Sequence, residues 1–395
     1  MQLYGRHYRL DEPICVTVEK SPGGAGGRIA TVELLPDAAD ERWPWIAPGF
    51  FDLQVNGYGG AWFSDETLSP EMVRTILEKY VAHGVTRLCP TLITNSFEAI
   101  RDGLVAIRTA CERDAWVNSM VAGCHVEGPY ISPEDGPRGA HPRSHVRPCD
   151  WDEFQRWQEA SGGRIRLMTL APEAGGAPEF IRRAVASGVT VAIGHTAATT
   201  AEIEAAVEAG ATLSTHLGNG THPVLPRHPN HLWDQLAEPR LRPSLITDGF
   251  HVPANFVRSV LLAKGVENCI ITCDASGLAG SPPGIYDYNG GRFEVLEEGP
   301  IVIAGQRKLL AGSGSLTDAC VAAAMTLAPL SLADACDLAG KNPARALGCE
   351  EIDLVPGSRA DLIVFDTAPS HLTIHATVLD GEIRYGTPWE PAEGQ

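Results

Sequence analysis

The sequence predicts a (β/α)₈ barrel (TIM barrel) of the α/β class joined to a small β-sandwich domain that is formed from the N- and C-terminal segments. Short apolar runs alternate with helical patterns through the middle of the 395-residue chain. About eight of these runs have the length of a buried strand, as a closed barrel requires. Strand patterns return near both termini. We therefore expect the barrel over residues 48–353 and the β-domain over residues 1–47 and 354–395.

The expected barrel strands are apolar segments, each followed by a helical pattern. They cover residues 45–55, 85–90, 119–126, 165–170, 189–193, 212–215, 244–247 and 268–273. Capping residues and glycines mark the ends of the helices, which are expected over residues 70–83, 97–113, 150–160, 177–187, 200–209, 253–264, 315–326, 332–339 and 343–347. A doubly wound open sheet is the rival architecture. Its Gly-x-Gly-x-x-Gly turn does not follow the first strand, where residues 56–60 read Asn-Gly-Tyr-Gly-Gly.

Strand patterns with turn residues frame the barrel at both ends. Near the N-terminus, two strands are expected over 14–19 and 28–34, joined by a glycine-rich hairpin loop at 21–27. Near the C-terminus, a turn and then a buried strand are expected over 356–366, with further strands over 373–379 and 382–385. Asp380-Gly381 is typical of a hairpin turn. Residues 291–304 read as a hairpin inserted late in the barrel.

Composition excludes several classes of protein. The chain has 31 basic and 49 acidic residues, and its net charge of −18 comes without a basic patch, so nucleic acid is not an expected partner. No apolar run has the roughly 18 residues of a membrane span, and no apolar signal segment follows the N-terminus. The ten cysteines contain no Cys-x-x-Cys pair, which favours free thiols in the cytoplasm.

Four expected strands end in side chains suited to metal or proton chemistry: Glu127, His195, His216 and Asp274. Catalytic groups of a barrel lie at the C-terminal ends of its strands. Two imidazoles and a carboxylate suit one divalent ion, most simply Zn²⁺, with Fe²⁺, Co²⁺ or Mn²⁺ as alternatives. Such an ion lowers the pKa of a bound water. Asp274 is then placed to accept the water's proton and pass it to a departing amine.

Other polar residues follow strands without so clear a role. His141 could polarise a substrate carbonyl, Arg227 could bind a phosphate or carboxylate, and Asn219-Gly220 could offer backbone donors to an anion. His251 also follows the end of an expected strand. Each also has a purely structural interpretation, as a loop or surface residue. His125 is expected to point to the face opposite Glu127 and to be structural. His222, His228 and His231 crowd one loop without an assignment.

The chain resembles the amidohydrolase superfamily and, within it, the N-acetylglucosamine-6-phosphate deacetylases. The resemblance rests on short motifs spread over nearly the whole chain: Pro48–Gly57, Pro90-Thr91-Leu92-Ile93-Thr94, His125–Tyr130, Gly194-His195-Thr196, Thr215–Asn219, Asp248–His251, Asp274-Ala275, Leu310–Ser313 and Pro356–Leu362. It implies a zinc-type hydrolase that removes the acetyl group from an amino-sugar phosphate.

The resemblance also implies roles for individual residues. Glu127, His195 and His216 match metal ligands, Asp274 the general base and acid, and His141 the residue that polarises the carbonyl. The substrate-binding positions implied are Ala140, His141, Asn219, Gly220, Arg227, His251, Leu310, Ala311, Gly312 and Ser313. Arg227 is expected to reach the site of a neighbouring subunit in a homodimer or homotetramer.

The chain departs from the family pattern in the first barrel strand and in two loops. Gln54 and Asn56 stand where many superfamily members have His-x-His, which favours a single metal ion. The loops after His216 and Arg227 also differ, so another N-acyl amino sugar, of the galactosamine or mannosamine type or without phosphate, stays open as the substrate. A barrel that has lost catalysis and serves as a binding module is the rival from another class.

Overall fold

The computed structural model describes residues 1–20, 26–36, 43–307, 309–368 and 371–390. Eight parallel strands form one sheet in the order β14-β13-β12-β11-β10-β9-β8-β5, and a parallel bridge from Val55 to Ala275 joins its two ends. The strands are β5 (Phe50–Val55), β8 (Val85–Ile93), β9 (Cys124–Glu127), β10 (Ile165–Leu170), β11 (Thr190–Ile193), β12 (Leu213–Ser214), β13 (Arg242–Ile246) and β14 (Ile270–Thr272). The predicted (β/α)₈ barrel is confirmed.

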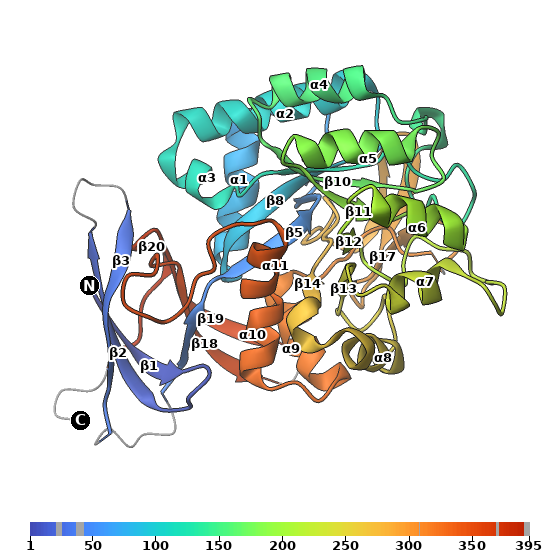
Figure 1. The fold of residues 1–395 in the computed structure, drawn as a ribbon. Coiled ribbons are helices and arrows are strands. Elements are labelled where there is room, and N and C mark those ends of the chain that lie inside the picture. The colour runs from blue at the N-terminus through green and yellow to red at the C-terminus, as the bar shows by residue number, and fades with distance from the viewer. Residues whose placement is uncertain (21–25, 37–42, 308, 369–370, 391–395) are drawn as a thin grey trace.

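Helices surround the barrel, and the terminal sheet lies at one side of it (Figure 1). The helices are α1 (Pro70–Val81), α2 (Phe97–Arg113), α3 (Ala115–Met120), α4 (Trp151–Ala160), α5 (Ala177–Ala186), α6 (Thr200–Glu208), α7 (His231–Ala237), α8 (Ala254–Lys264), α9 (Thr317–Leu327), α10 (Leu332–Leu338) and α11 (Lys341–Ala346). None of the helices in the described part of the chain is long and apolar enough to cross a bilayer.

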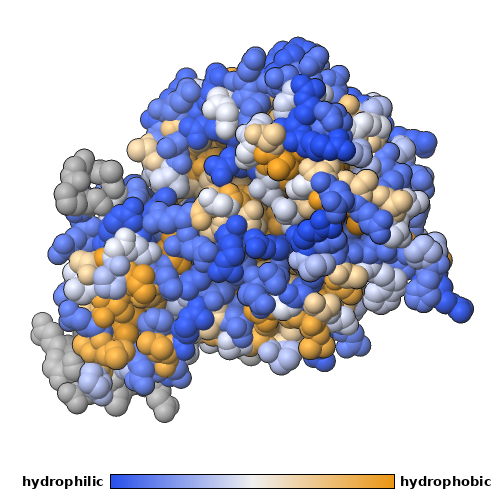
Figure 2. Space-filling view, viewed as in Figure 1, coloured by the Kyte–Doolittle hydropathy of each residue, from blue (hydrophilic) through white to orange (hydrophobic). Residues whose placement is uncertain are grey.

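The terminal strands form one seven-stranded, mainly antiparallel sheet in the order β20-β19-β18-β4-β1-β2-β3. Its strands are β1 (Gln2–His7), β2 (Pro13–Lys20), β3 (Gly27–Leu34), β4 (Trp45–Pro48), β18 (Leu362–Ala368), β19 (His371–Leu379) and β20 (Glu382–Gly386). Two backbone hydrogen bonds run from β3 to the C-terminal segment: Gly27 N–H donates to the Asp380 oxygen, and Ile29 N–H donates to the Ser358 oxygen. They connect β3, at one edge of the sheet, to the turn between β19 and β20 and to the segment before β18. In Figure 2, hydrophobic residues gather on this side of the molecule. The exact division into two domains stays a prediction.

Two predicted strands differ from the structure. Residues 45–55 are two strands of different sheets, because the chain crosses from one sheet to the other at Gly49, where a Cβ would lie 2.2 Å from the Thr86 methyl carbon. The strand expected over 119–126 begins only at Cys124. The side chain of Asp114 caps Trp116 instead and starts the short helix α3.

Several elements carried no clear signal in the sequence. Strand β1 and helix α7 were not expected, and the late insertion has three strands, β15 (Gly284–Tyr288), β16 (Gly291–Val295) and β17 (Ile301–Ile303), rather than a two-stranded hairpin. The Asp380-Gly381 turn is confirmed, with both residues at positive φ, as a type I′ hairpin turn requires. The predicted loop at 21–27 lies largely outside the described residues.

The barrel is filled by side chains below its mouth. An apolar cluster takes residues from six strands, among them Phe51, Leu167 and Ile270, and includes Ala344 and Leu347. Toward the carboxyl ends of the strands, the buried side chains become threonines and histidines. This change from apolar to polar filling places the chemistry at the C-terminal mouth of the barrel.

Candidate active site at the mouth of the barrel

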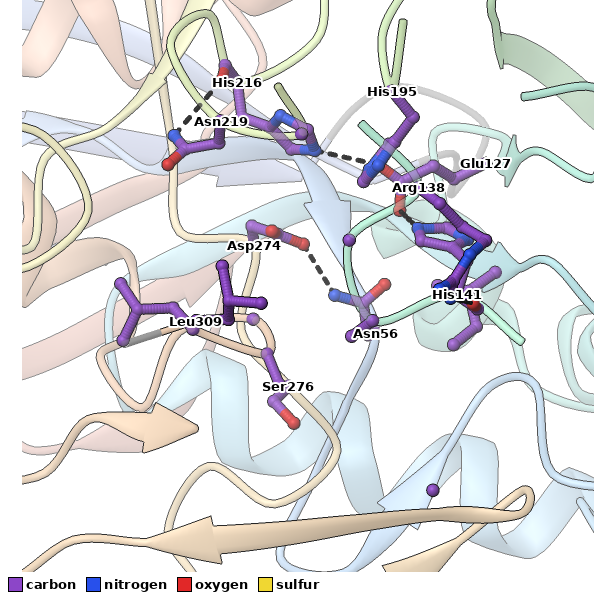
Figure 3. Close-up of a pocket in the computed structure, with 18 of the residues that line it drawn as sticks. Asn56, Glu127, Arg138, His141, His195, His216, Asn219, Asp274, Ser276 and Leu309 are labelled. Atoms are coloured by element: carbon purple, nitrogen blue, oxygen red, sulfur yellow. Dashed lines mark hydrogen bonds and ion pairs between the residues drawn. The ribbon is translucent and has the colours of Figure 1, made fainter. Parts of the chain in front are cut away.

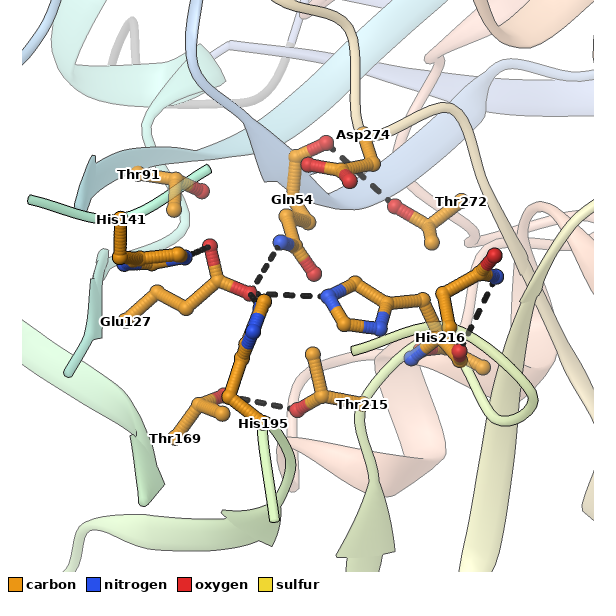
Figure 4. A network of polar contacts seen from close by, with 12 residues as sticks. Gln54, Thr91, Glu127, His141, Thr169, His195, Thr215, His216, Thr272 and Asp274 are labelled. Carbon is orange, nitrogen blue, oxygen red and sulfur yellow. Dashed lines mark hydrogen bonds and ion pairs between the residues drawn. The ribbon is translucent and has the colours of Figure 1, made fainter. Parts of the chain in front are cut away.

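The four strand-end residues come together at one place. Glu127 is the last residue of β9, and His195, His216 and Asp274 each stand two residues beyond the end of β11, β12 and β14. All four are buried, with exposed fractions between 2% and 8%. Figure 4 shows Glu127 between the imidazoles of His195, His216 and His141. Residues far apart in the sequence therefore share one polar centre.

The backbone at three of these positions is strained. His195, His216 and Asp274 have φ of 51°, 30° and 48°, a left-handed conformation that non-glycine residues rarely adopt. Such a conformation costs on the order of 1–3 kcal/mol and persists where the surrounding structure enforces it, commonly at functional sites. Because the same left-handed conformation recurs beyond three parallel strands, we infer that the positions of these three side chains are constrained in the same way.

Glu127 is the common acceptor of this centre. Its Oε1 lies 2.8 Å from Gln54 Nε2, 3.0 Å from His216 Nε2 and 3.2 Å from His195 Nε2. Burial alone would raise the pKa of Glu127, but the hydrogen bond and charge of His195 and the hydrogen bond of His216 hold it well below its ordinary value. Burial alone would lower the pKa of His216, whereas its bond to Glu127 raises it.

This donor set fits a divalent cation. One carboxylate and neighbouring imidazoles are ligands that Zn²⁺ and similar ions accept. The ligand atoms of Glu127, His141 and His195 lie within 4.8 Å of one another. His216 contacts Glu127 Oε1, the carboxylate oxygen that His195 also contacts. The Nδ1 of His195 lies 2.9 Å from the carbonyl oxygen of Pro137, an acceptor that fixes a proton on Nδ1. The nitrogen that would bind a metal is therefore Nε2, the atom that contacts Glu127.

Asp274 lies beside this centre and has one oriented oxygen. The amide Nδ2 of Asn56 donates to its Oδ1 at 2.7 Å (Figure 3). Burial, and next the negative charge of Glu127, raise the pKa of Asp274 to about 6. A carboxyl group with a pKa near neutrality can both take up and release a proton at physiological pH.

A cavity of about 470 Å³ opens above these residues. Of the predicted substrate-binding residues, eight line it: Ala140, His141, Asn219, Gly220, His251, Leu310, Ala311 and Gly312. Two do not. Arg227 is exposed on a loop outside the cavity, and Ser313 is buried behind it.

Ser313 supports a cavity residue indirectly. Its hydroxyl donates to Asp248 Oδ2 at 2.9 Å, and the same oxygen lies 2.7 Å from His251 Nδ1. Burial would raise the pKa of Asp248, but the hydrogen bonds from His251 lower it. Since a carboxylate only accepts, His251 carries its Nδ1 proton toward Asp248.

His125 does not point away from Glu127, and the prediction that it does is wrong. Residues two apart in a strand share a face. The ring of His125 lies 2.8 Å from the hydroxyl of Thr169 and 3.3 Å from that of Thr91, on the two neighbouring strands. Burial lowers the pKa of His125 to about 4, so the ring is neutral and serves as a hydrogen-bonded support.

An aromatic wall of the cavity was missed from the sequence. Trp62 stacks on Tyr288 of the inserted sheet with ring centroids 4.2 Å apart, and Phe293 packs against it. Gly277 makes this possible, because a Cβ there would lie 2.4 Å from the indole. Arg138 also lines the cavity and donates to the backbone oxygen of His141. In the sequence, the aromatic residues of the late insertion were the signal that could have indicated this wall.

Comparison with known proteins defines the class. The amidohydrolase family model matches residues 45–386, and the chain belongs to the amidohydrolase family. Within it, the chain falls in the group of the N-acetylglucosamine-6-phosphate deacetylases. It is 34% identical to the human protein of that name over 91% of this chain and 90% of that one. It is 32% identical to an N-acetylgalactosamine-6-phosphate deacetylase from Escherichia coli O157:H7, over 87% and 89% of the two chains.

Solved structures agree with this placement. The N-acetyl-D-glucosamine-6-phosphate deacetylase of Mycobacterium smegmatis superposes with a TM-score of 0.83 at 30% identity, covering 94% of this chain and 95% of that chain. The Thermotoga maritima enzyme superposes with a TM-score of 0.81 at 25% identity, covering 96% and 97%. More distant amidohydrolases such as an enamidase, at 15% identity and a TM-score of 0.56, share the fold.

Proposed function

We propose that this protein hydrolyses the N-acetyl amide of an amino-sugar 6-phosphate and releases acetate and the amino-sugar phosphate. The observation that carries this proposal is the convergence of Glu127, His195 and His216 beside Asp274 in one cavity. We assign the first three as ligands of one divalent metal ion, most simply Zn²⁺, with Fe²⁺, Co²⁺ and Mn²⁺ as alternatives. When bound, such an ion activates water and polarises the amide carbonyl.

The chain's own residues supply the proton transfers. Asp274 has its Oδ1 held by Asn56, and its Oδ2 makes no hydrogen bond with a described residue. Asp274 takes one proton from the attacking water as the new C–O bond forms. It returns that proton to the sugar nitrogen as the C–N bond breaks, because an amine anion is too poor a leaving group.

His141 completes the proposed reacting centre. Burial, and next the charge of His195, lower the pKa of His141 to about 3, so its ring is neutral. A neutral imidazole with a proton on Nε2 can donate a hydrogen bond to the amide carbonyl and stabilise negative charge that develops there.

The sugar and its phosphate are assigned to the wider part of the cavity. Asn219, Gly220 and His251 line one part of it, and residues 310–312 line another. Arg227 is exposed and does not line its own cavity, which supports the proposal that it serves the site of a second copy in a homodimer or homotetramer. The relatives named above act on 6-phosphates of both glucosamine and galactosamine derivatives, so the epimer is left to experiment.

One alternative function has a specific observation in its favour, and a second has one against it. Gly218 lines the cavity where the family usually has a bulkier residue, and Thr221 lines it where the family usually has Met. These differences favour testing other N-acyl amino sugars, including mannosamine and unphosphorylated forms. A non-catalytic barrel is disfavoured because all four reactive groups are present.

Ten free cysteines support a reducing cytoplasm as the place of action.

The test is acetate release from six N-acetylated sugars by purified protein loaded with each candidate metal. The panel contains the glucosamine, galactosamine and mannosamine derivatives, each with and without a 6-phosphate. We expect a 6-phosphate to give the highest kcat/KM. Equal rates with and without phosphate would remove the phosphate roles of His251 and Arg227. No acetate from any sugar under any metal would refute the proposed function.

A further inference from the structure

Thr94 lies directly against His141 and has no role in the proposed chemistry so far. It follows strand β8, and its Oγ1 is 2.8 Å from His141 Nδ1. Thr94 is fully buried and His141 is 5% exposed, so water does not compete for this contact. A hydroxyl can either donate or accept a hydrogen bond. Its choice therefore decides which nitrogen of the neutral imidazole carries the proton.

The only other described acceptor near the hydroxyl is a poor one. The backbone oxygen of Glu127 lies 3.4 Å from Thr94 Oγ1, well beyond the usual O–H···O range of about 2.5–3.0 Å. His141 Nδ1 at 2.8 Å is the better acceptor. The hydroxyl of Thr94 therefore donates to Nδ1, and the imidazole proton lies on Nε2.

The other side of the ring leads to the same tautomer. His141 Nε2 faces Glu127 Oε2 at 3.7 Å. A lone pair on Nε2 would face the negative carboxylate and be repelled, whereas an N–H is attracted to it. The distance is too long for a full hydrogen bond, so this N–H remains available to an incoming group.

His195 is held in the opposite way. Its Nδ1 lies 2.9 Å from the Pro137 carbonyl oxygen, which can only accept, so Nδ1 carries a proton and Nε2 is the nitrogen that would be bare when a metal ion is bound. A bare nitrogen binds a metal, and a protonated one donates to a carbonyl. The partner behind each ring thus separates His141, whose Nε2 lies 3.7 Å from Glu127, from His195, whose Nε2 lies 3.2 Å from it.

The hydroxyl of Thr94 has room where it lies because residue 128 is a glycine. A Cβ on Gly128, which has φ of +77°, would lie 2.1 Å from Thr94 Oγ1. Only glycine leaves room there and also tolerates that backbone conformation. Glycine at position 128 is therefore the residue that is compatible with a hydroxyl at the observed position of Thr94 Oγ1.

We propose that Thr94 is a positioning residue for the deacetylation: its hydroxyl donates to His141 Nδ1 and keeps the proton on Nε2. His141 then donates to the substrate carbonyl instead of joining Glu127 and His195 as a metal ligand. The kinetic part of this proposal rests on the proposed function, whereas the tautomer does not.

The first test is NMR of zinc-loaded protein labelled with ¹⁵N-histidine, in which long-range ¹H–¹⁵N spectra distinguish the two tautomers. The His141 signals are identified by their loss in His141→Gln. We expect the Nε2–H form in the wild type and in Thr94→Ser, and loss of that form in Thr94→Val. An Nδ1–H form in the wild type would overturn the proposal, and this spectrum does not depend on the Val variant folding.

The second test separates kcat from KM. Thr94→Val should lower kcat by about 10–100-fold, less than the roughly 10²–10³-fold that loss of a whole oxyanion donor produces. KM should stay within about threefold. Thr94→Ser should retain kcat. Thr377→Val is the matched control, because the Thr377 hydroxyl, in strand β19 of the terminal sheet, is equally buried but donates at 2.7 Å to the backbone oxygen of Val81 at the end of α1.

The outcomes distinguish the two proposals. A wild type that releases no acetate overturns the proposed function and leaves the tautomer assignment to the NMR test. An active wild type whose kcat is unchanged in Thr94→Val overturns the positioning role. An equal loss of kcat in Thr377→Val shows a general effect of removing a buried hydroxyl and also overturns it.

Discussion

Replacing Asp274 by asparagine isolates the proton transfer from the geometry of the site. The side-chain oxygen of asparagine can still accept from Asn56 Nδ2, which lies 2.7 Å from Oδ1 in the wild type. The amide nitrogen takes the place of Oδ2 and cannot accept a proton. General acid–base catalysis contributes about 10²–10⁴-fold. At about 1.36 kcal/mol for each tenfold, kcat should fall by an amount equivalent to about 3–5 kcal/mol.

Stability should not fall with activity in Asp274→Asn. Burial and the charge of Glu127 raise the pKa of Asp274 to about 6, which means that its negative charge is unfavourable in the folded protein. A neutral amide removes that charge, so the melting temperature should be unchanged or higher. A fall in kcat without a fall in melting temperature is therefore the expected signature.

The assay measures acetate release at saturating substrate, with metal content determined on the same sample. Asp102→Asn is the matched control, because this aspartate is exposed on α2 and pairs with Arg101 far from the cavity. A kcat for Asp274→Asn within threefold of wild type at full metal occupancy would show that another group moves the proton.

Three further substitutions test other parts of the structure. Glu127→Gln removes the central charged ligand, and metal affinity should fall by more than the roughly 10–100-fold that loss of an outer partner costs; full metal content after dialysis would contradict the ligand assignment. Gly128→Ala places a Cβ 2.1 Å from Thr94 Oγ1 at a φ of +77°, so the free energy of unfolding, measured in urea, should drop by about 1–3 kcal/mol; an unchanged value would show that the loop adapts. Burial raises the pKa of Asp361 to about 6 despite the Arg359 guanidinium 3.0 Å away. Because the folded-state pKa lies above the unfolded one, ionisation of Asp361 destabilises the protein as pH rises from about 4 to 6, by about 3 kcal/mol above that range. Asp361→Asn should therefore gain melting temperature relative to wild type between pH 4 and pH 7.5, and a difference that does not change with pH would contradict this.

Local patterns predicted much of the fold because the elements depend on neighbouring residues. Helix α2 runs over Phe97–Arg113 as expected, since the Ser96 side chain caps its first turn and its apolar residues face inward. The Asp380-Gly381 turn needs only two residues at positive φ. Local patterns failed at Gly49, where an apolar run spans two sheets, because the change of sheet is imposed by Thr86 and Asp361 from elsewhere in the chain.

The site followed the same division. Glu127, His195, His216 and Asp274 were found because parallel strands deliver their carboxyl ends to one mouth. The residues behind them were not found. Thr94, Arg138 and the stacked pair Trp62–Tyr288 act through contacts between segments far apart in sequence.

The sequence by itself determined the kinds of reactive group and their order along the barrel strands, because strand periodicity and strand ends are local properties. Tertiary structure decided which atoms face one another. Closure of the barrel brings Glu127 Oε1 within hydrogen-bond distance of two imidazoles from other strands. Packing of the loops sets Thr94 behind His141 and leaves Arg227 outside the cavity. Those distances depend on contacts between distant segments, which no local pattern contains.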